Sequence, residues 1–257
     1  MRVSAPNLYR MINHFKVNVS DNPLPEGSSP SIPGYLQATY WWAYIHPRGV
    51  RIFERQWLVN LILWGNYRRL CDAVLHGYGQ DICGRTLQIA CAYGNLTPRL
   101  SENIGAEGAL EVIDILPIQL SNLARKLPKI SSVKLHCMDS TSLIFPDHHF
   151  ERALLFFLLH EQPLDARIKT LAEAVRVIRP GGTLTIVDYA GPGWLNPLRY
   201  VMAPILALLE PFARELWYEE VVAWLPQDAN VSVHKKQRFF GGLYQIITLE
   251  IGSAAVK

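Results

Sequence analysis

Short apolar runs separated by polar turns recur from residue 86 onward and predict a series of β-strands. The runs lie at residues 86–90, 110–113, 133–137, 152–159 and 183–187. Apolar side chains three and four positions apart, the spacing of a helix, lie between them at residues 96–104, 117–127 and 168–178. This alternation of strand and helix predicts an α/β fold with a doubly wound sheet, whose ligands bind at the carboxyl ends of the strands.

The end of the chain departs from this alternation. Residues 196–214 carry few charges and predict a helix that is capped by Asn196 and kinked at Pro204. A helix that is apolar on nearly every side is either buried or faces lipid or a greasy substrate. Residues 231–234 and 243–251 are then expected to form two more strands.

Aromatic side chains are concentrated near the start of the chain. The first 34 residues, which are rich in proline and glycine toward their end, predict an extended lead-in. The aromatic residues that follow are Tyr35, Tyr40, Trp41, Trp42 and Tyr44. This segment is either a lid packed on the core or the wall of a pocket for a flat or lipid-like substrate.

Residues 48–64 show helical spacing with two distinct faces. The apolar positions are Val50, Phe53, Trp57, Leu61 and Trp64, and the basic positions are Arg48, Arg51 and Arg55. A basic amphipathic helix with tryptophans is typical of a helix lying on a membrane surface. An ordinary surface helix with its apolar stripe in the core gives the same pattern.

Composition narrows the function classes. The 257 residues are 49% hydrophobic and 18% charged, which is typical of a folded protein, and a net charge of +3 gives no reason to expect nucleic acid as a partner. The four cysteines form no CxxC pair, which indicates a reducing, cytoplasmic compartment. Since neither a signal peptide nor an apolar run of about 18 residues is visible, we expect a soluble or membrane-surface protein.

Residues 85–116 combine the features of a nucleotide-type binding site. The first strand leads into a turn of small residues around Ala90, Ala92 and Gly94, and the second strand ends at Asp114. A turn of small residues lets the backbone approach a ligand, and an acid that closes the second strand accepts ribose hydroxyls.

The sequence LQIACAYG at residues 87–94 resembles the cofactor turn of the class I S-adenosylmethionine-dependent methyltransferases, with Gln88 where an acid is usual and Ala90 and Ala92 where glycines are usual. The resemblance implies a Rossmann-like sheet with an antiparallel C-terminal edge, and S-adenosylmethionine as cofactor. Asp114 matches the acid that binds the ribose, and Asp139 matches the residue at the adenine. The implied cofactor-binding residues are Gln88, Ala90, Ala92, Tyr93, Gly94, Asp114, Ile115, Met138, Asp139 and Ser140.

A closer resemblance spans roughly residues 35–226. The motifs YWWAYIHP, FERQWLVNLILWGN, DILPIQLSNLARKLP, FFLLHEQP and IVDY together resemble the rhodoquinone biosynthesis proteins of bacteria, which are similar to the ubiquinone and menaquinone C-methyltransferases. This resemblance implies that the amino group of S-adenosylmethionine is transferred to ubiquinone, where it replaces a methoxy group. It also implies a divalent metal, manganese.

Several polar residues near strand ends fit such a reaction. An acid at position 88 would hold the amine of the cofactor as an ammonium, which cannot attack a carbon, whereas Gln88 is neutral and lets the amine lose its proton. The alternative is that Gln88 results from sequence drift in a binding loop and has no role in the reaction. His160, Glu161 and Tyr189 are the candidate catalytic residues, and His160 and Asp188 are the candidate metal ligands. A hydrogen-bonded core histidine is the alternative for His160.

We therefore expect two segments with separate roles. Residues 1–80 cap the substrate pocket, and residues 81–257 form the S-adenosylmethionine-binding domain. The first predicted function is amino transfer to ubiquinone by a protein attached to the inner face of the cytoplasmic membrane. Methylation of a quinone or another lipid is the second, and binding of cofactor and quinone without catalysis is the third. The sequence leaves the oligomeric state open.

Overall fold

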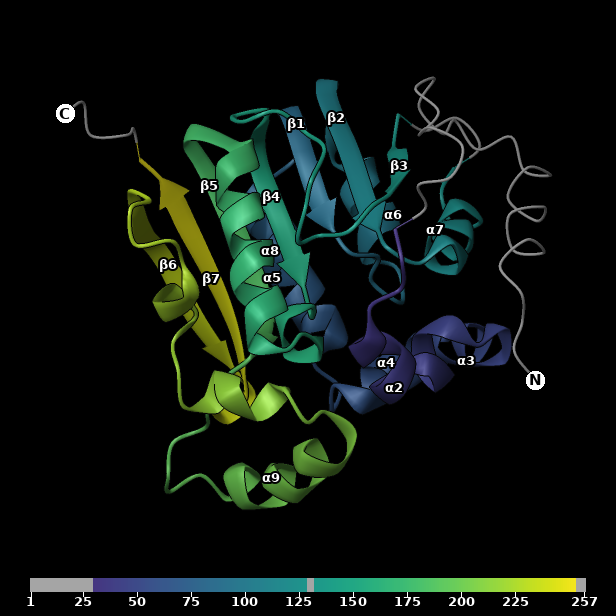
Figure 1. Cartoon of the computed structure of the whole chain (residues 1–257), viewed down its shortest axis with the longest axis vertical. Helices are drawn as coiled ribbons and strands as arrows, with labels where there is room; N and C mark the ends of the chain where they lie inside the picture. The colour runs from purple at the N-terminus through teal and green to yellow at the C-terminus, as the bar shows by residue number, and fades with distance from the viewer. Residues whose placement is uncertain (1–29, 129–131, 253–257) are drawn as a thin grey trace.

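The computed structural model describes residues 30–128 and 132–252, and its centre is a seven-stranded sheet (Figure 1). The strands follow the order β3-β2-β1-β4-β5-β7-β6. Their bounds are β1 Ile82–Ile89, β2 Ile104–Asp114, β3 Lys134–Cys137, β4 Phe150–Phe156, β5 Ile178–Tyr189, β6 Val231–Phe239 and β7 Tyr244–Ile251. Strands β1 to β5 run parallel, and β7 pairs antiparallel with β5 and β6. The predicted doubly wound sheet with an antiparallel C-terminal edge is confirmed.

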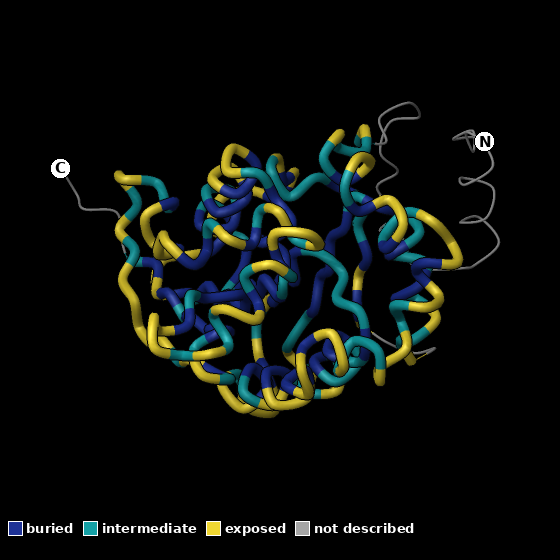
Figure 2. The backbone as a smooth tube through the Cα atoms, turned by 90° about the horizontal axis from the view of Figure 1, so that it is seen from below, coloured by how far each residue is buried: buried dark blue, intermediate teal, exposed yellow. Residues whose placement is uncertain are grey.

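The apolar runs become strands because helices cover both faces of the sheet. Leu87 and Ile89 on β1 and Leu154 and Leu155 on β4 are fully buried, as parallel strands covered on both sides require. The flanking helices are α5 Tyr67–Tyr78, α6 Leu96–Glu102, α7 Pro117–Ala124 and α8 Leu164–Val177. In Figure 1, α8 lies in front of the sheet and α5 behind it. Seen along the strands, buried segments lie inside a ring of exposed loops and helices (Figure 2).

Strand β2 begins earlier than the apolar pattern predicts. Gly105 and Gly108 lie between the predicted helix at residues 96–104 and the predicted strand at residues 110–113, but the structure places both inside β2. Gly108 lies opposite Gly84, and a Cβ at Gly108 would come 2.0 Å from the carbonyl oxygen of Ile82. The missing side chain therefore permits the close approach of β1 and β2. Strand β4 in turn ends at Phe156, because Phe157 has a φ of +54° and turns the chain into the 3-10 helix η2, Leu159–Glu161.

The segment before α5 forms a series of short helices. They are α2 Gly34–Thr39, the π-helix η1 Trp41–Ile45, α3 Pro47–Phe53 and α4 Gln56–Ile62. The single helix predicted for residues 48–64 is wrong, because Arg55 has an extended conformation with ψ of 115° between α3 and α4. Val50 is buried whereas Trp57 is 61% exposed, so the predicted apolar face is not one surface. Most of the predicted lead-in lies outside the described residues.

Helix α9, Pro197–Leu209, begins where the sequence predicts. Asn196 Oδ1 accepts a hydrogen bond from the backbone N–H of Leu198 at 3.0 Å, and Pro204 lies inside the helix. The helix ends before Arg214, and short 3-10 helices follow: η3 Ala213–Trp217, η4 Val221–Trp224 and η5 Phe240–Gly242. Helices α2, α3, α4 and α9 lie at one end of the molecule, beyond the carboxyl ends of β1 and β4 (Figure 1).

No helix within residues 30–128 and 132–252 combines the length and the apolar character needed to cross a bilayer.

Candidate active site

Asp114 fastens the end of β2 to the turn that follows β1. Its two carboxylate oxygens accept hydrogen bonds from the backbone N–H groups of Cys91 and Leu116, both at 2.8 Å. Burial raises the pKa of Asp114 to about 6, against the opposing effect of these two donors. The side chain is therefore ionised at neutral pH, at the position where an acid accepts ribose hydroxyls.

Gln88 lies behind this turn. Its side chain is fully buried, donates from Nε2 to the carbonyl of Ala90 at 3.0 Å and accepts from the hydroxyl of Thr97 at 2.9 Å. Ala90 has a φ of +71°, a left-handed conformation that costs energy for a residue with a Cβ, and the Gln88 amide holds its carbonyl in place. The interpretation that Gln88 faces the amine of the cofactor therefore does not hold.

The start of α6 closes the turn on its other side. The hydroxyl of Tyr67 accepts from the N–H groups of Asn95 and Leu96, at 2.8 and 3.0 Å, and donates to the carbonyl of Tyr93 at 3.1 Å. Gly94 has a φ of +81°, and a Cβ there would lie 2.5 Å from the Tyr67 hydroxyl. Contact with Tyr67 thus requires a glycine at this point of the turn.

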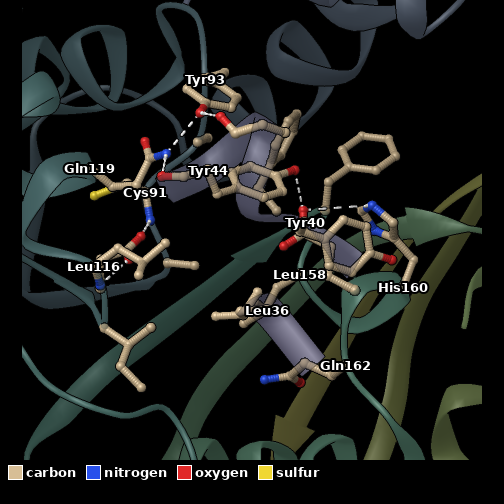
Figure 3. A pocket seen from close by; sticks show the side chains of 18 of the residues that line it. Leu36, Tyr40, Tyr44, Cys91, Tyr93, Leu116, Gln119, Leu158, His160 and Gln162 are labelled. Atoms are coloured by element: carbon tan, nitrogen blue, oxygen red, sulfur yellow. Dashed lines mark hydrogen bonds and ion pairs between the residues drawn. The ribbon is translucent and has the colours of Figure 1, made fainter. Parts of the chain in front are cut away.

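One cavity joins the turn to the short helices of the N-terminal segment (Figure 3). At the end formed by β1, β2 and β3 it is lined by Ala90, Cys91, Ala92, Tyr93, Asp114, Ile115, Met138, Asp139 and Ser140. At the other end it is lined by Tyr35, Tyr40, Trp42, Tyr44, His160, Glu161, Tyr189 and Glu210. A molecule bound at the turn therefore meets one bound among the aromatic rings.

The N-terminal segment is bonded directly to the turn. The hydroxyl of Tyr93 donates to the carbonyl of Ala43 at 2.7 Å, and Gln119 Nε2 donates to the carbonyl of Tyr44 at 3.1 Å and to the Tyr93 hydroxyl at 2.7 Å. The rings of Tyr44 and Tyr93 stack, with centroids 5.4 Å apart and planes 8° from parallel (Figure 3). This segment forms a wall of the cavity, and its place depends on a residue of the turn itself.

Four ionisable side chains meet at the aromatic end of the cavity. His160 Nδ1 lies 3.0 Å from Asp188 Oδ1. On its other side, His160 Nε2 lies 3.8 Å from Glu161 Oε1 and 3.9 Å from Glu210 Oε2. The hydroxyl of Tyr44 donates a hydrogen bond to Glu161. We call His160, Glu161, Asp188 and Glu210 the acid cluster.

The acid cluster retains protons near neutral pH. Burial opposes a charge on His160, but Asp188, with a smaller contribution from Glu210, outweighs this effect and raises the pKa of His160 to about 9. Burial raises the pKa of Glu161 to about 8 and also raises the pKa of Glu210, in both cases against the attraction of His160. At pH 7 His160 is therefore a cation and Glu161 a neutral carboxylic acid, and both are proton donors.

Most of the residues predicted for the site line the cavity, with four exceptions. Gln88 and Gly94 lie behind the turn and support its shape. Trp41, predicted as a substrate contact, is 51% exposed and lies outside the cavity wall, because the π-helix directs it to the surface. Asp188 is fully buried and acts on the cavity through His160.

The predicted manganese ligands do not fit a metal site. Asp188 engages His160 Nδ1 with one oxygen and accepts the backbone N–H of Leu159, at 2.9 Å, with the other. In the part of the chain that the structure describes, no group of three or more His, Cys, Asp or Glu side chains is arranged to hold a metal ion. The His160–Asp188 pair is instead suited to hold a positive charge on the imidazole.

Glu210 and Gln119 contribute to the site and are missed by sequence reasoning. Glu210 caps the C-terminal end of α9 and is the lone acid within residues 196–214. Its carboxylate interacts with the hydroxyl of Tyr40, and its Oε2 lies 3.9 Å from His160 Nε2. A single carboxylate in an otherwise apolar helix can be recognised in the sequence as a candidate site residue, because burying a charge without a partner costs free energy.

Known proteins match the chain over its central part. Residues 86–182 match a family model described as a methyltransferase domain. The ubiquinone/menaquinone biosynthesis C-methyltransferase of Idiomarina loihiensis is 30% identical over 133 residues, which are 51% of this chain and 50% of that protein. The protein of the same name from Yersinia pestis is 24% identical over 184 residues, 70% of each chain. The chain thus spans about half the length of the first of these relatives.

Solved structures share the fold. The 1,6-didemethyltoxoflavin-N1-methyltransferase of Burkholderia thailandensis, with bound 1,6-didemethyltoxoflavin and S-adenosylhomocysteine, gives a TM-score of 0.53 at 21% identity over 91% of this chain and 94% of that chain. An S-adenosylmethionine-dependent methyltransferase of Methanosarcina mazei gives 0.54 at 18% identity, over 70% and 97%. The chain therefore has the Rossmann-like fold of these methyltransferases.

Proposed function

We propose that this protein transfers the amino group of S-adenosylmethionine to ubiquinone, in place of a ring methoxy group. The observation that carries the proposal is a cofactor-type turn and a pair of proton donors, His160 and Glu161, in one aromatic cavity. The resemblance to the rhodoquinone biosynthesis proteins and the similarity to the ubiquinone/menaquinone C-methyltransferases both favour a quinone as the acceptor.

S-adenosylmethionine binds at the carboxyl edge of β1, β2 and β3. Asp114 accepts the ribose hydroxyls, and Met138 and Asp139 lie beside the adenine. Asp139 is oriented for this contact by Thr141, whose N–H and hydroxyl both donate to Asp139 Oδ1 at 2.8 Å. The methionine part of the cofactor then extends past Tyr93 toward the acid cluster, since that is where the cavity continues.

The quinone ring lies among the aromatic residues of the N-terminal segment. The flat faces of Tyr35, Tyr40 and Tyr44 suit a flat acceptor ring. The hydroxyl of Tyr40 and the carboxyl group of Glu210, which line the same end of the cavity, supply polar contacts for ring oxygens.

The charge state of the acid cluster favours amino transfer over methyl transfer. When an amine adds to a quinone ring carbon, negative charge collects on a carbonyl oxygen, which Glu161 can protonate and cationic His160 can stabilise. Loss of methoxide from the ring and of a proton from the nitrogen releases methanol, so the substitution consumes no net proton. Methylation of a ring carbon requires a base instead of an acid, because that carbon must lose a proton.

Release of the amino group from its donor needs a second step. The donor Cα is oxidised to a keto group, the quinone ring accepts the two electrons and becomes a quinol, and water supplies the keto oxygen. Besides methanol, the reaction therefore has a 2-keto acid as a co-product, which methyl transfer would not produce.

Methyl transfer to a quinone or another lipid is the second candidate. It is favoured by the names of the relatives and by the methyltransferase domain. One incubation separates the two reactions. S-adenosylmethionine labelled with nitrogen-15 in the amino group and carbon-13 in the methyl group is mixed with ubiquinone, with and without manganese, and the quinone product is weighed by mass spectrometry.

Amino transfer predicts a product that contains nitrogen-15 and has lost one methoxy group. A product with carbon-13 and no nitrogen-15 would replace the proposal with methyl transfer. Tight binding of both compounds with neither product, also with manganese, would support a binding protein without catalysis. Glu161→Gln serves as the matched control, because it keeps the shape of the side chain and removes the proton that is transferred.

The proposed quinone substrate also indicates where in the cell the protein acts. A quinone with an isoprenoid tail is dissolved in the bilayer, so the protein acts at a membrane surface, on the cytoplasmic side of the cytoplasmic membrane.

A further inference from the structure

We infer that the end of the molecule that carries the cavity is a docking surface for an anionic lipid bilayer. Two stretches of the chain form this surface. The first arm is residues 41–64, which include η1, α3 and α4, and the second arm is residues 194–209, which include α9. In this role the surface depends on the proposed function, because the bilayer is where a quinone with an isoprenoid tail is dissolved.

The first arm exposes large apolar side chains that ordinarily pack inside a protein. Trp41 is 51% exposed, Trp57 61%, Leu61 64% and Trp64 45%. Isolated exposed apolar residues are common, but a cluster of this size marks an interaction surface. Tryptophan in particular suits the interface between lipid head groups and acyl chains.

The second arm exposes a similar set on the other side of the cavity. Helix α9 buries Met202 and Leu206 and exposes Tyr200, Val201, Leu208 and Leu209. Trp194 is 71% exposed, Leu195 74% and Leu208 82%. The helix is thus anchored along one side and free to contact lipid along the other.

The two arms form one surface that is continuous with the cavity. They lie at the same end of the molecule (Figure 1), and the rings of Tyr35 and Phe212, which flank the two arms in the chain, make an edge contact with centroids 6.4 Å apart. Trp42 and Ile62 of the first arm line the cavity and are nevertheless 42% and 43% exposed. A substrate can therefore pass from the surface into the cavity along apolar side chains.

The charge of the first arm indicates that the partner of this surface is anionic. Arg48, Arg51 and Arg55 are exposed on the first arm, and the single acid in that arm, Glu54, pairs with Lys126 at 2.8 Å. Basic residues beside exposed tryptophans are complementary to anionic head groups. A second copy of the chain fits less well, because a two-fold dimer through this surface would set arginine against arginine.

Vesicle binding of the full chain tests the surface. Flotation with vesicles of phosphatidylcholine alone, or with phosphatidylglycerol added, measures the partition of the wild type and three variants. Trp57→Ser with Leu208→Ser should lower binding at least tenfold. Replacing Arg48, Arg51 and Arg55 by glutamine should lower binding to the anionic vesicles roughly fivefold for each arginine at low salt, and should reduce its salt dependence.

Ile144→Ser is the matched control. Ile144 is 66% exposed but belongs to the loop that Arg176 holds, with bonds from Arg176 to the carbonyls of Leu143 and Phe145 far from either arm. This variant should bind vesicles like the wild type. Equal binding by the Trp57–Leu208 variant, or equal binding to neutral and anionic vesicles, would overturn the inference.

A second assay separates this inference from the proposed function. A quinone with a short, water-soluble tail should be converted by the surface variants as fast as by the wild type, because no cavity residue of the acid cluster is changed. Conversion of that quinone by a wild type that does not bind vesicles would refute the docking surface alone. If light scattering then shows a dimer, a second copy is the occupant. Vesicle binding without conversion of any quinone would refute the proposed function alone.

Discussion

Gln88 donates a hydrogen bond from its side-chain amide to the carbonyl of Ala90, 3.0 Å away, and holds Ala90 at a φ of +71°. A glutamate at position 88 has no such donor and would place a carboxylate against that carbonyl. Two departures from the resembled methyltransferase turn, the amide at 88 and the alanine at 90, are therefore parts of one arrangement. The amide stabilises a backbone conformation that alanine adopts only with support.

Gln88→Glu should weaken both the fold and the binding of S-adenosylmethionine. Loss of a buried hydrogen bond and the new contact between two oxygens should cost about 1–3 kcal/mol in the free energy of unfolding. Adding Ala90→Gly should recover part of this loss, because glycine adopts the same φ without support. Unfolding and calorimetric titration of the wild type, both single variants and the double variant form a complete cycle, and strictly additive changes would contradict the coupling.

Asp114→Ala should lower the affinity for S-adenosylmethionine by about 1–3 kcal/mol, the scale of lost hydrogen bonds to a charged group. It should also lower the melting temperature, because the N–H groups of Cys91 and Leu116 lose their acceptor. Asp72→Ala, which removes an acid that pairs with Arg99 at the surface, is the control and should leave the affinity unchanged. An unchanged affinity for Asp114→Ala would remove its role at the ribose.

The sheet could be predicted from the sequence because fully buried parallel strands are apolar along their whole length. Leu154 and Leu155 illustrate this, since both faces of β4 are covered. The first half of β2 could not be predicted in this way, because Gly105 and Gly108 carry no side chain whose pattern could reveal a strand. Its strand character comes from pairing with β1, which is a tertiary contact.

Some residues of the candidate site could likewise be predicted from the sequence, and others could not. Asp114 and Asp139 follow directly from strand ends, which a parallel sheet brings to one edge. Glu210 faces His160 across 50 positions of the chain, a contact that only the folding back of α9 creates. The orientation of the Gln88 side chain could not be predicted either. Side chains alternate between the two faces of β1, and residue 88 points into the core, whereas the expected role at the cofactor requires a side chain at the surface of the cavity.

Transfer activity should fall as the pH rises through about 8 to 9. Glu161 and His160 are protonated below their raised pKa values of about 8 and about 9, and the proposed reaction uses both as acids. The activity of Glu161→Gln should be low, and its remaining pH dependence should follow His160 alone. A rate that keeps increasing above about pH 9, where an ordinary α-amino group is already neutral, would mean that the cluster acts as a base, as methyl transfer to a ring carbon requires.

Stability should decrease over an overlapping pH range. Glu161 ionises near 4.5 in the unfolded chain and near 8 in the folded protein, so between these values folding retains a proton that unfolding releases, and the free energy of unfolding falls as the pH rises. His160 gives the same sign between about 6.5 and 9. Thermal unfolding from pH 6 to 9.5 checks this, and Glu161→Gln should flatten the part of the curve below pH 8. A wild type whose melting temperature stays constant across the range would show that neither group holds its proton.

Glu210→Gln should shift the alkaline limb of the pH–rate profile to lower pH without changing the affinity for S-adenosylmethionine. The carboxylate of Glu210 lies 3.9 Å from His160 Nε2 and helps to raise the pKa of both His160 and Glu161. A neutral amide in its place removes that effect, so both groups should lose their protons at lower pH. Glutamine preserves the size of the side chain, and thus the end of α9.

Glu250→Gln is the control for this shift. Glu250 also lies near a histidine, 3.8 Å from His234 Nδ1, but both side chains are at least half exposed and lie on β6 and β7. Its replacement should leave the profile unchanged. If Glu210→Gln lowered the melting temperature while the alkaline limb stayed in place, Glu210 would be a structural cap of α9. A shifted limb at unchanged cofactor affinity is the result expected of a residue that positions the protons of the acid cluster.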